Sequence, residues 1–126
     1  MTDFLYPSSC WLLWDKGFSV DVTFAQYEMA WTSFKSSAKK YDYNAAANKN
    51  RIHPTQKPVK LYEWLLQNYA KQGDRILDTH LGSGSSAIAA HYGGFDFVGC
   101  ELDTDYFNAA KARFERETAQ LAMFGA

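Results

Sequence analysis

The stretch from Asp74 to Leu102 constrains the fold of this chain more than any other part of the sequence. It opens with a short apolar run that ends at Asp78, and a turn rich in glycine and serine follows at once. Small, helix-forming residues come next, the pair Gly93-Gly94 is expected to end their helix, and a second apolar run then leads to Glu101. Strand, glycine turn, helix and strand in this order are typical of α/β proteins. We therefore expect an α/β domain that contains this unit.

The turn has the composition of a ligand-binding loop. Gly82 and Gly84 let the backbone approach a ligand closely, and the free N–H groups of a helix that begins near Ser83 point at whatever lies above the turn. Glu101 ends the second strand about 20 residues further on, where an acid accepts hydrogen bonds from ribose hydroxyls. This arrangement predicts a pocket for a nucleoside that carries a polar tail.

The glycine pattern alone has weak specificity. It lacks the third glycine of a dinucleotide-binding fingerprint, and no lysine follows as a phosphate-binding loop requires. A tight turn that only joins a strand to a helix would carry the same residues, so it is the placement of Glu101 that favours a nucleoside site. An oxidoreductase that uses a dinucleotide is a further alternative, and the missing glycine argues against it.

Composition limits the classes of protein and partner. The chain has 126 residues, the length of one domain, and 47% of them are hydrophobic. A net charge of −1 gives no overall basic character, so contact with nucleic acid would require a local patch. Cys10 and Cys100 are too few for a disulfide framework and have no metal-site spacing, so we expect reduced, partly buried thiols and no metal. Without a secretory leader or an apolar run of membrane-spanning length, the expected location is the cytoplasm.

The first half of the chain predicts strands, followed by a helix. The apolar run Cys10–Trp14 is typical of a strand buried on both faces, and residues 28–34 predict another strand. Residues 20–27 are ambiguous between a short helix and a strand. Thr55 can cap a helix with Pro58 in its first turn, and the apolar face of this helix is expected in the core.

A final helix is predicted after Glu101, with Asp103 or Thr104 as its cap. Its expected inward stripe consists of Tyr106, Phe107, Ala110 and Phe114. The charged residues that we expect to be solvated on it are Lys111, Arg113, Glu115, Arg116 and Glu117.

Residues 35–52 form a basic segment without hydrophobic periodicity, so we expect a surface loop. Asp42 is its only acid, and tyrosines and amides are interleaved with the cations. Such a surface suits contact with a nucleic-acid backbone and its bases, and a solvated loop has the same composition. The cations that could contact nucleic-acid phosphates are Lys35, Lys39, Lys40, Lys49 and Arg51.

Three blocks of sequence stand in a fixed order: His53-Pro54-Thr55-Gln56-Lys57-Pro58, then Leu77-Asp78-Thr79-His80-Leu81-Gly82-Ser83-Gly84-Ser85-Ser86, then Gly99-Cys100-Glu101-Leu102-Asp103. In this order the chain resembles the DNA amino-methyltransferases, which methylate N6 of adenine or N4 of cytosine with S-adenosylmethionine. It resembles their permuted arrangement, in which the cofactor-binding half is C-terminal, and residues 10–16 and 30–34 are similar to the small phage-type members. The resemblance implies a partial Rossmann-like, three-layer αβα fold and double-stranded DNA as substrate.

The resemblance also implies a set of residues that bind S-adenosylmethionine. Thr55, Gln56 and Lys57 would cap its amino-acid end, with Lys57 paired to the carboxylate. Glu101 would hold the ribose hydroxyls and Leu102 would pack on the adenine. The turn under the methionine part would consist of Asp78, Thr79, Leu81, Gly82, Ser83 and Gly84.

Other side chains receive weaker assignments from the same resemblance. Trp31 is a candidate for lining the pocket of a target base that has been flipped out of the duplex. His80 stands where many members have a phenylalanine, and we expect a positioned or packing side chain rather than a catalytic base. His53 is expected to be a turn residue.

One family motif is missing. Members carry a tetrapeptide of Asp, Ser or Asn, two prolines and an aromatic residue, which accepts hydrogen bonds from the target amine and stacks on the base. This sequence has no Pro-Pro pair, so no catalytic residue is identified and activity of the chain alone is not expected. The strand before that tetrapeptide is also expected to be absent.

We expect one incomplete methyltransferase domain over residues 1–126. Within it, residues 1–34 would supply strands of the catalytic side, residues 35–52 a possible target-recognition loop, and residues 53–126 the cofactor-binding half. A sheet that lacks an interior strand exposes its edges, so we expect a homo-oligomer or a partner chain that supplies the missing strands. The resemblance implies the cofactor- and DNA-binding portion of a truncated or split DNA methyltransferase. The alternative function is a non-catalytic module that binds S-adenosylmethionine or nucleic acid.

Overall fold

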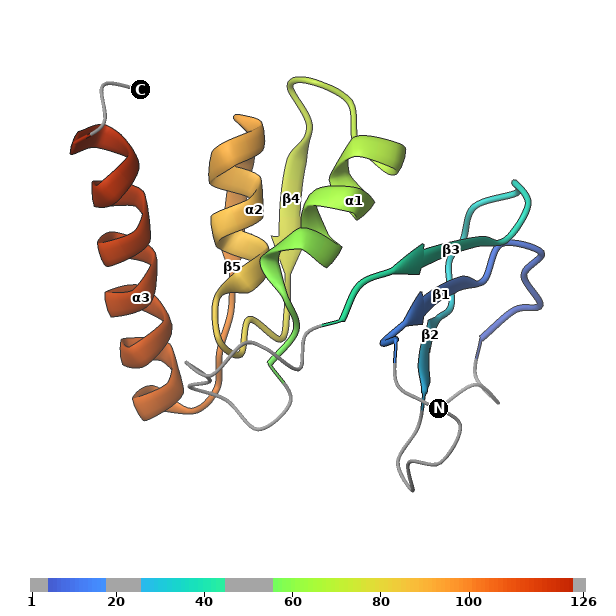
Figure 1. The fold of residues 1–126 in the computed structure, drawn as a ribbon, viewed down its shortest axis with the longest axis horizontal. Helices are drawn as coiled ribbons and strands as arrows, with labels where there is room; N and C mark the ends of the chain where they lie inside the picture. Colours follow the sequence, from blue (N-terminus) through green and yellow to red (C-terminus); the bar gives the residue numbers. More distant parts are fainter. Residues whose placement is uncertain (1–4, 18–25, 45–55, 124–126) are drawn as a thin grey trace. The chain divides into compact units, whose positions relative to one another are not determined.

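The computed structural model describes residues 5–17, 26–44 and 56–123 of the chain, with the backbone alone for 120–123. These residues belong to two compact units, an N-terminal unit of residues 1–47 and a C-terminal unit of residues 48–126. Each unit has its own sheet (Figure 1).

The sheet of the N-terminal unit has the strand order β2-β1-β3. The central strand β1 (Leu12–Asp15) pairs antiparallel with β2 (Tyr27–Ala30) and parallel with β3 (Lys39–Asp42). Leu12 and Trp14 are buried while Leu13 and Asp15 are only half-buried, so the strand predicted here is confirmed but is fully covered on one face only. The thiol of Cys10 is buried and that of Cys100 is exposed.

Two expectations for this unit need correction. Residues 39–42 form strand β3 within the segment expected to be loop, because parallel pairing with β1 supplies its backbone hydrogen bonds whatever its polar composition. The strand predicted over 28–34 begins at Tyr27 and ends at Ala30. The ambiguous residues 20–27 lie mostly outside the described residues.

The C-terminal unit contains the elements α1 (Val59–Tyr69), β4 (Arg75–Asp78), α2 (Ser85–Gly93), β5 (Asp96–Gly99) and α3 (Thr104–Met123). Strands β4 and β5 pair in parallel, with Ile76 opposite Phe97 and Leu77 opposite Val98. Helix α2 joins them and packs on α1, β5 and α3. Strand, turn, helix and strand thus occur as the sequence predicts.

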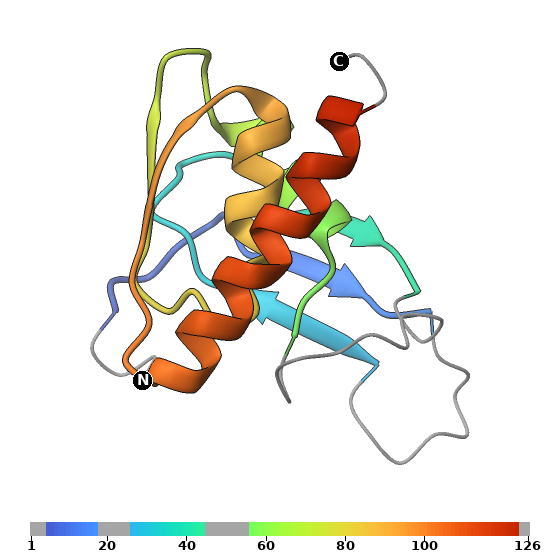
Figure 2. The same ribbon diagram turned by 90° about the vertical axis from the view of Figure 1, so that its left-hand side faces the viewer.

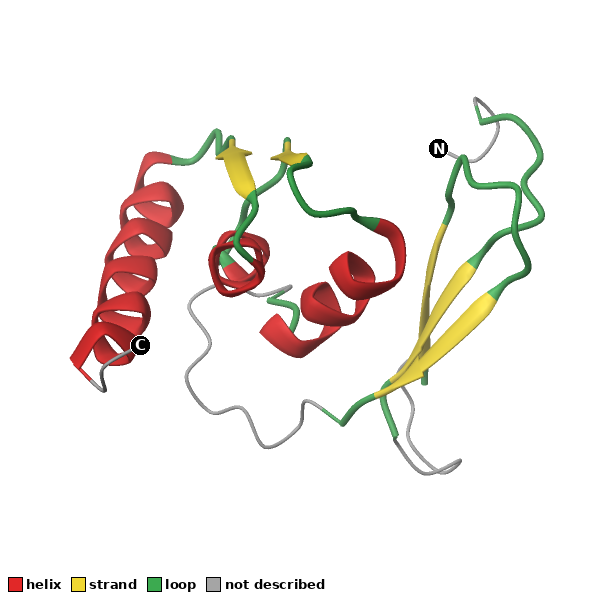
Figure 3. Ribbon diagram, turned by 90° about the horizontal axis from the view of Figure 1, so that it is seen from above, coloured by secondary structure: helices red, strands yellow, loops and turns green. Residues whose placement is uncertain are grey.

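All three helices lie on the same side of the β4–β5 pair, with α2 between α1 and α3 (Figure 3). Figure 2 shows α3 running past α2. The alternation of the strands agrees with this arrangement, because Ile76 and Phe97 are half-buried whereas Leu77 and Val98 are 65% and 61% exposed. The described part of this unit therefore forms two of the three layers of an αβα fold.

The helix boundaries follow local chemistry. Gly94 has a φ of 76° and caps the C-terminus of α2, as the Gly93-Gly94 pair predicts. Asp103 caps α3, since its Oδ1 accepts the N–H of Tyr106 at 2.9 Å. Pro58 is the N-cap of α1 rather than a residue of its first turn, and the expected cap Thr55 lies outside the described residues.

Candidate functional site

The candidate site lies at the carboxyl ends of β4 and β5, where the chain leaves the sheet through the glycine turn. Asp78 ends β4, and its carboxylate accepts two hydrogen bonds from residues that follow it. Oδ1 accepts the N–H of His80 at 3.0 Å, and Oδ2 accepts the hydroxyl of Ser86 at 2.5 Å. Because Ser86 belongs to the first turn of α2, one carboxylate ties the end of the strand to the start of the helix.

Strand β5 holds the same turn from the other side. The N–H of Cys100 donates to the carbonyl of Asp78 at 2.8 Å, and the N–H of Leu81 donates to the carbonyl of Cys100 at 2.8 Å. These bonds continue the parallel pairing beyond the ends of the strands. The turn is therefore docked on the tip of β5, beside Glu101.

Glu101 is fixed by the backbone. Its Oε2 accepts the N–H of Gly82 at 2.8 Å, and its Oε1 accepts the N–H of Asp103 at 3.2 Å. A carboxylate oxygen accepts more than one hydrogen bond, so both oxygens retain capacity for donors of a ligand. The acid at the tip of the second strand is thus oriented before a ligand arrives.

Gly84 is required by conformation and by packing. It is the N-cap of α2 with a φ of 85°, a region that other residues rarely adopt. A Cβ at this position would lie 3.3 Å from the Cβ of Ala110, so α3 approaches the turn closely from behind. The N–H groups of the first turn of α2 have no carbonyl partner within the helix and point out of this end, where partial positive charge accumulates.

A cavity of about 470 Å³ opens over the turn. Its size falls in the usual range for small-molecule sites. The lining residues are Gln56, Lys57, Tyr62, Asp78, His80, Leu81, Gly82, Ser83, Ser85 and Glu101. An amide and an ammonium group from the segment before α1 therefore share one cavity with the carboxylate of Glu101.

Most residues predicted for the cofactor meet in this cavity. Those that line it are Gln56, Lys57, Asp78, Leu81, Gly82, Ser83 and Glu101. Three others do not line it. Thr79 is exposed, Gly84 faces the apolar pocket between α2, β5 and α3, and Leu102 is 100% exposed. Thr55 and His53 lie outside the described residues.

Tyr62 also lines the cavity, although the sequence did not predict it as a site residue. It lies on α1 next to the buried Leu61, off the apolar stripe that packs in the core, and its position soon after Lys57 is the only signal for it. His80 lines the cavity and is exposed, with its Nδ1 2.9 Å from the hydroxyl of Thr79.

Arg113 was expected to be solvated, and this prediction is wrong. Its side chain is 8% exposed and lies behind the glycine turn. Nε donates to Oε1 of Glu117 at 3.0 Å, and Nη1 donates to the carbonyl of Ser83 at 3.1 Å. Position on a helical wheel does not reveal such burial, because the partners of Nη1 come from a turn 28 to 30 residues earlier.

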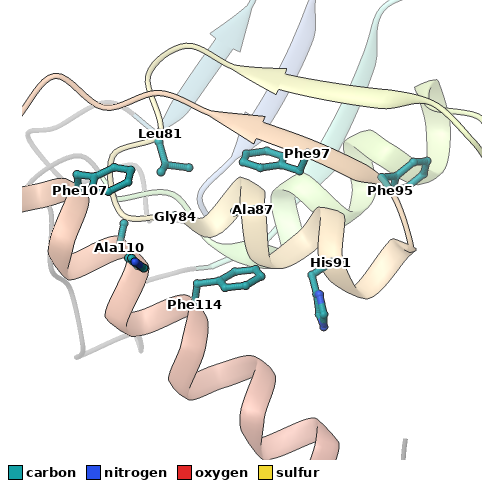
Figure 4. A pocket seen from close by; sticks show the side chains of 10 residues that line it. Leu81, Gly84, Ala87, His91, Phe95, Phe97, Phe107, Ala110 and Phe114 are labelled. Atoms are coloured by element: carbon teal, nitrogen blue, oxygen red, sulfur yellow. The ribbon is translucent and has the colours of Figure 1, made fainter.

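A second, apolar pocket of about 280 Å³ lies on the other side of the turn, between α2, β5 and α3 (Figure 4). Its walls are mainly aromatic and include Phe97, Phe107 and Phe114. The ring of His91 meets that of Phe114 edge-on, with centroids 5.5 Å apart. Since few polar groups converge here, the cavity over the turn is the better candidate for a polar ligand.

The DNA-binding candidates that the structure describes belong to the N-terminal unit. Lys35 and Lys39 are exposed. Lys40 lies 3.2 Å from a carboxylate oxygen of Asp42 and 3.7 Å from one of Asp15, and the hydrogen bond to Asp42 raises the pKa of Lys40.

The remaining candidates carry less structural information. Trp31 is half-buried, and its Nε1 donates to the carbonyl of Tyr6 at 2.8 Å. Lys49 and Arg51 lie outside the described residues. Within the described ranges no helix is long and apolar enough to cross a membrane, and no three His, Cys, Asp or Glu side chains form a metal-binding cluster.

Comparison with known proteins identifies relatives of this chain. It is 40% identical over 65 residues to the type II methyltransferase M2.DpnII of Streptococcus pneumoniae, covering 52% of this chain and 24% of that protein. It is 37% identical over 71 residues to the type II methyltransferase M.HpaI of Haemophilus parainfluenzae, covering 56% of this chain and 23% of that protein. The matched part is thus about a quarter of the length of these curated relatives.

Two solved structures share the fold. The M1.HpyAVI–SAM complex superposes with a TM-score of 0.62 at 24% identity, covering 82% of this chain and 60% of that one. The putative DNA modification methylase TTHA0409 from Thermus thermophilus, complexed with S-adenosyl-L-methionine, gives 0.57 at 20% identity, covering 85% and 52%. These likenesses confirm the partial Rossmann-like α/β fold. Residues 9–112 match the sequence pattern of the DNA methylase family, and the chain therefore belongs to this family.

Proposed function

We propose that this chain is the S-adenosylmethionine-binding portion of a DNA amino-methyltransferase that modifies N6 of adenine or N4 of cytosine. The observation that carries the proposal is the hydrogen bond from the N–H of Gly82 to Glu101, at the rim of a cavity that also contains Lys57. One contact joins the glycine turn to the acid of the second strand, and family membership over residues 9–112 supports the assignment.

The residues of the cavity fit such a cofactor by their chemistry. A nucleoside with an amino-acid tail presents a ribose diol, which donates hydrogen bonds, and a carboxylate, which accepts them. Glu101 supplies acceptors on a fixed carboxylate, and Lys57 and Gln56 supply a cation and an amide. The N-terminus of α2 adds N–H groups and partial positive charge on the side of the turn.

The chain's residues contribute binding and orientation. When bound, the cofactor supplies a methyl group on a sulfonium, which is already an activated donor, so proximity and alignment provide most of the catalysis. Glu101 and the glycine turn would fix the nucleoside and the methionine part, and Lys57 would hold the carboxylate. Removal of the proton from the target amine is not assigned to any residue in the described ranges.

The proposal extends to double-stranded DNA as the methyl acceptor. The target base must leave the stack to reach the donor, and Trp31 is proposed to line the base pocket. Lys35, Lys39 and Lys40 are proposed to contact phosphates, with Lys49 and Arg51 from the segment outside the described residues. Lys40 is the weakest of these, since two carboxylates already balance its charge.

Methyl transfer also requires the proline-containing tetrapeptide, which this sequence lacks. We propose that polypeptide outside this sequence supplies it, together with the strand before it, and that the complex acts on DNA in the cytoplasm. The exposed apolar face of β4 and β5, with Leu77 and Val98, is compatible with such a complex or with a homo-oligomer.

A methyl-transfer assay on DNA tests the proposal against a purely non-catalytic module. The chain is assayed alone and mixed with the N-terminal part of a related methyltransferase that contains the tetrapeptide. The proposal predicts methylated adenine or cytosine in the mixture only. The same mixture with Glu101→Ala in the chain is the control and should be inactive. Absence of product in a mixture that forms a stable complex would contradict the proposal and favour the non-catalytic module.

A further inference from the structure

Arg113 is the buried cation that faces the glycine turn from α3, on the side away from the candidate cavity. Its Nη1 donates to the carbonyl of Ser83 at 3.1 Å and to the hydroxyl of Ser85 at 2.9 Å. A longer contact of 3.3 Å reaches the hydroxyl of Ser83. Glu117, one turn along the same helix, accepts the Nε–H at 3.0 Å and balances the charge. Removing a guanidinium from water is unfavourable, and the bonds of Nε and Nη1 together with the carboxylate of Glu117 offset this cost.

The carbonyl that Arg113 binds belongs to a peptide group whose other end is also fixed. The N–H of Gly84, in the same planar group as the carbonyl of Ser83, donates to the carbonyl of Leu81 at 3.1 Å. The peptide plane between Ser83 and Gly84 is therefore held at both ends. A guanidinium on one side and a carbonyl on the other determine which way it faces.

The next peptide group continues the same pattern. The carbonyl of Leu81 shares a plane with the N–H of Gly82, and this N–H donates to Oε2 of Glu101 at 2.8 Å. Two peptide groups in series thus connect Arg113 to Glu101, with every hydrogen bond donated in the same direction. The series begins at a cation and ends at an anion, so each bond polarises and strengthens the next.

We propose that Arg113 is a positioning residue for the cofactor site, acting through these two peptide groups on the turn and on the carboxylate of Glu101. It does not touch the ligand. Its role rests on the proposed function in one respect, namely that the turn and Glu101 bind S-adenosylmethionine. The positioning of the turn by Arg113 is a property of the unliganded protein.

The proximity of α3 to the turn supports this role. Ala110 lies one helical turn before Arg113 and contacts the place where Gly84 has no side chain. The small residue and the glycine allow the helix to approach closely enough for the guanidinium to reach Ser83. Arg116, which follows on the same helix, is exposed and provides a matched control.

Amide hydrogen exchange on the unliganded 126-residue chain tests the positioning directly. Arg113→Met keeps the length of the side chain and removes its donors, Arg113→Lys keeps a charged donor, and Arg116→Met is the control. We expect exchange at Gly82 and Gly84 to be at least about tenfold faster in Arg113→Met than in the control, with Arg113→Lys in between. Exchange at Ala89 and Ala90 inside α2 should remain unchanged. Equal exchange at both glycines in all variants would overturn the proposal, and if Arg113→Met does not fold, Arg113→Lys carries the comparison.

A double-mutant cycle connects the positioning to the ligand. The affinity for S-adenosylhomocysteine is measured for the wild type, Arg113→Lys, Glu101→Gln and the double variant. Each single variant lowers the affinity by some factor, and independent effects would make the factor of the double variant the product of the two. If Arg113 acts through Glu101, the factor of the double variant is at least about threefold smaller than that product. Multiplicative losses would show that Arg113 is merely structural and would overturn the proposal. If the wild type binds no ligand, the proposed function fails, and hydrogen exchange alone decides whether Arg113 positions the turn.

Discussion

The N–H of Gly82 donates to Oε2 of Glu101 at 2.8 Å, across 19 residues of sequence. This bond makes the glycine turn after β4 and the acid after β5 a single structural unit. The two features that a nucleoside site requires are therefore positioned by each other as well as by the strands. Loss of either partner should change the other.

Replacing Glu101 should weaken cofactor binding while leaving the fold intact. Glu101→Gln keeps the shape of the side chain and removes its charge, and hydrogen bonds to charged groups contribute about 1.5–3 kcal/mol. We expect the dissociation constant for S-adenosylmethionine to rise about 10- to 100-fold. Glu115→Gln, at an exposed position of α3, is the control. Calorimetric titration makes the comparison, and equal affinities for the two variants would exclude the assigned role of Glu101.

Gly84 should tolerate alanine less well than a glycine with similar backbone strain in open space. Gly84→Ala imposes a side chain at φ 85° and places its Cβ 3.3 Å from that of Ala110. Gly73 has a φ of 92° and no atom within 4 Å of such a Cβ, so Gly73→Ala measures the strain alone, about 1–2 kcal/mol. Thermal unfolding should show the larger decrease in Tm for Gly84→Ala. A larger decrease for Gly73→Ala would contradict the close packing of α3 on the turn.

The N-terminus of α3 depends on Asp103. Its Oδ1 accepts the N–H of Tyr106, and removal of an N-cap side chain destabilises a protein by about 1 kcal/mol. Asp103→Ala should therefore lower the free energy of unfolding by about this amount, as measured by urea denaturation. Asp103→Asn, which retains an acceptor, should restore most of the loss. If alanine and asparagine have the same effect, the cap does not stabilise the helix.

Tyr92 should make the C-terminal unit sensitive to alkaline pH. Tyr92 is 40% exposed, and desolvation of its covered part raises its pKa, with the nearby carboxylates of Glu117 and Glu63 acting in the same direction. The folded state then keeps the proton longer than the unfolded state, whose tyrosine pKa is about 10. The stability from neutral Tyr92 is complete below about pH 10 and is lost as the pH rises through the raised pKa. Tyr92→Phe should reduce the fall in Tm between neutral and alkaline pH, and an unchanged fall would contradict the assignment.

The C-terminal unit could be predicted from sequence because its signals are local. Glycines at the turn, the pair Gly93-Gly94 at the end of α2 and the cap at Asp103 each act within a few residues, and the structure confirms them. Family resemblance located the cavity residues Gln56 and Lys57, which periodicity alone would have left in a connecting segment.

The rest could not be predicted because it depends on partners distant in the sequence. Strand β3 has the polar composition of a loop, and only pairing with β1 makes it a strand. Arg113 stands among charged residues that predict a solvated helix face, and the carbonyl and hydroxyls of the turn make its burial favourable. Tyr62 carries no pattern of its own and enters the cavity because α1 is placed beside the turn.

Calorimetric titration of the 126-residue chain with S-adenosylmethionine tests the central claim most directly. We predict saturable binding at one site in the wild type and its loss in Glu101→Ala, with the two proteins giving the same circular dichroism. Absence of binding to the folded wild type, or equal binding to both proteins, would contradict the claim that the cavity over the glycine turn binds the cofactor.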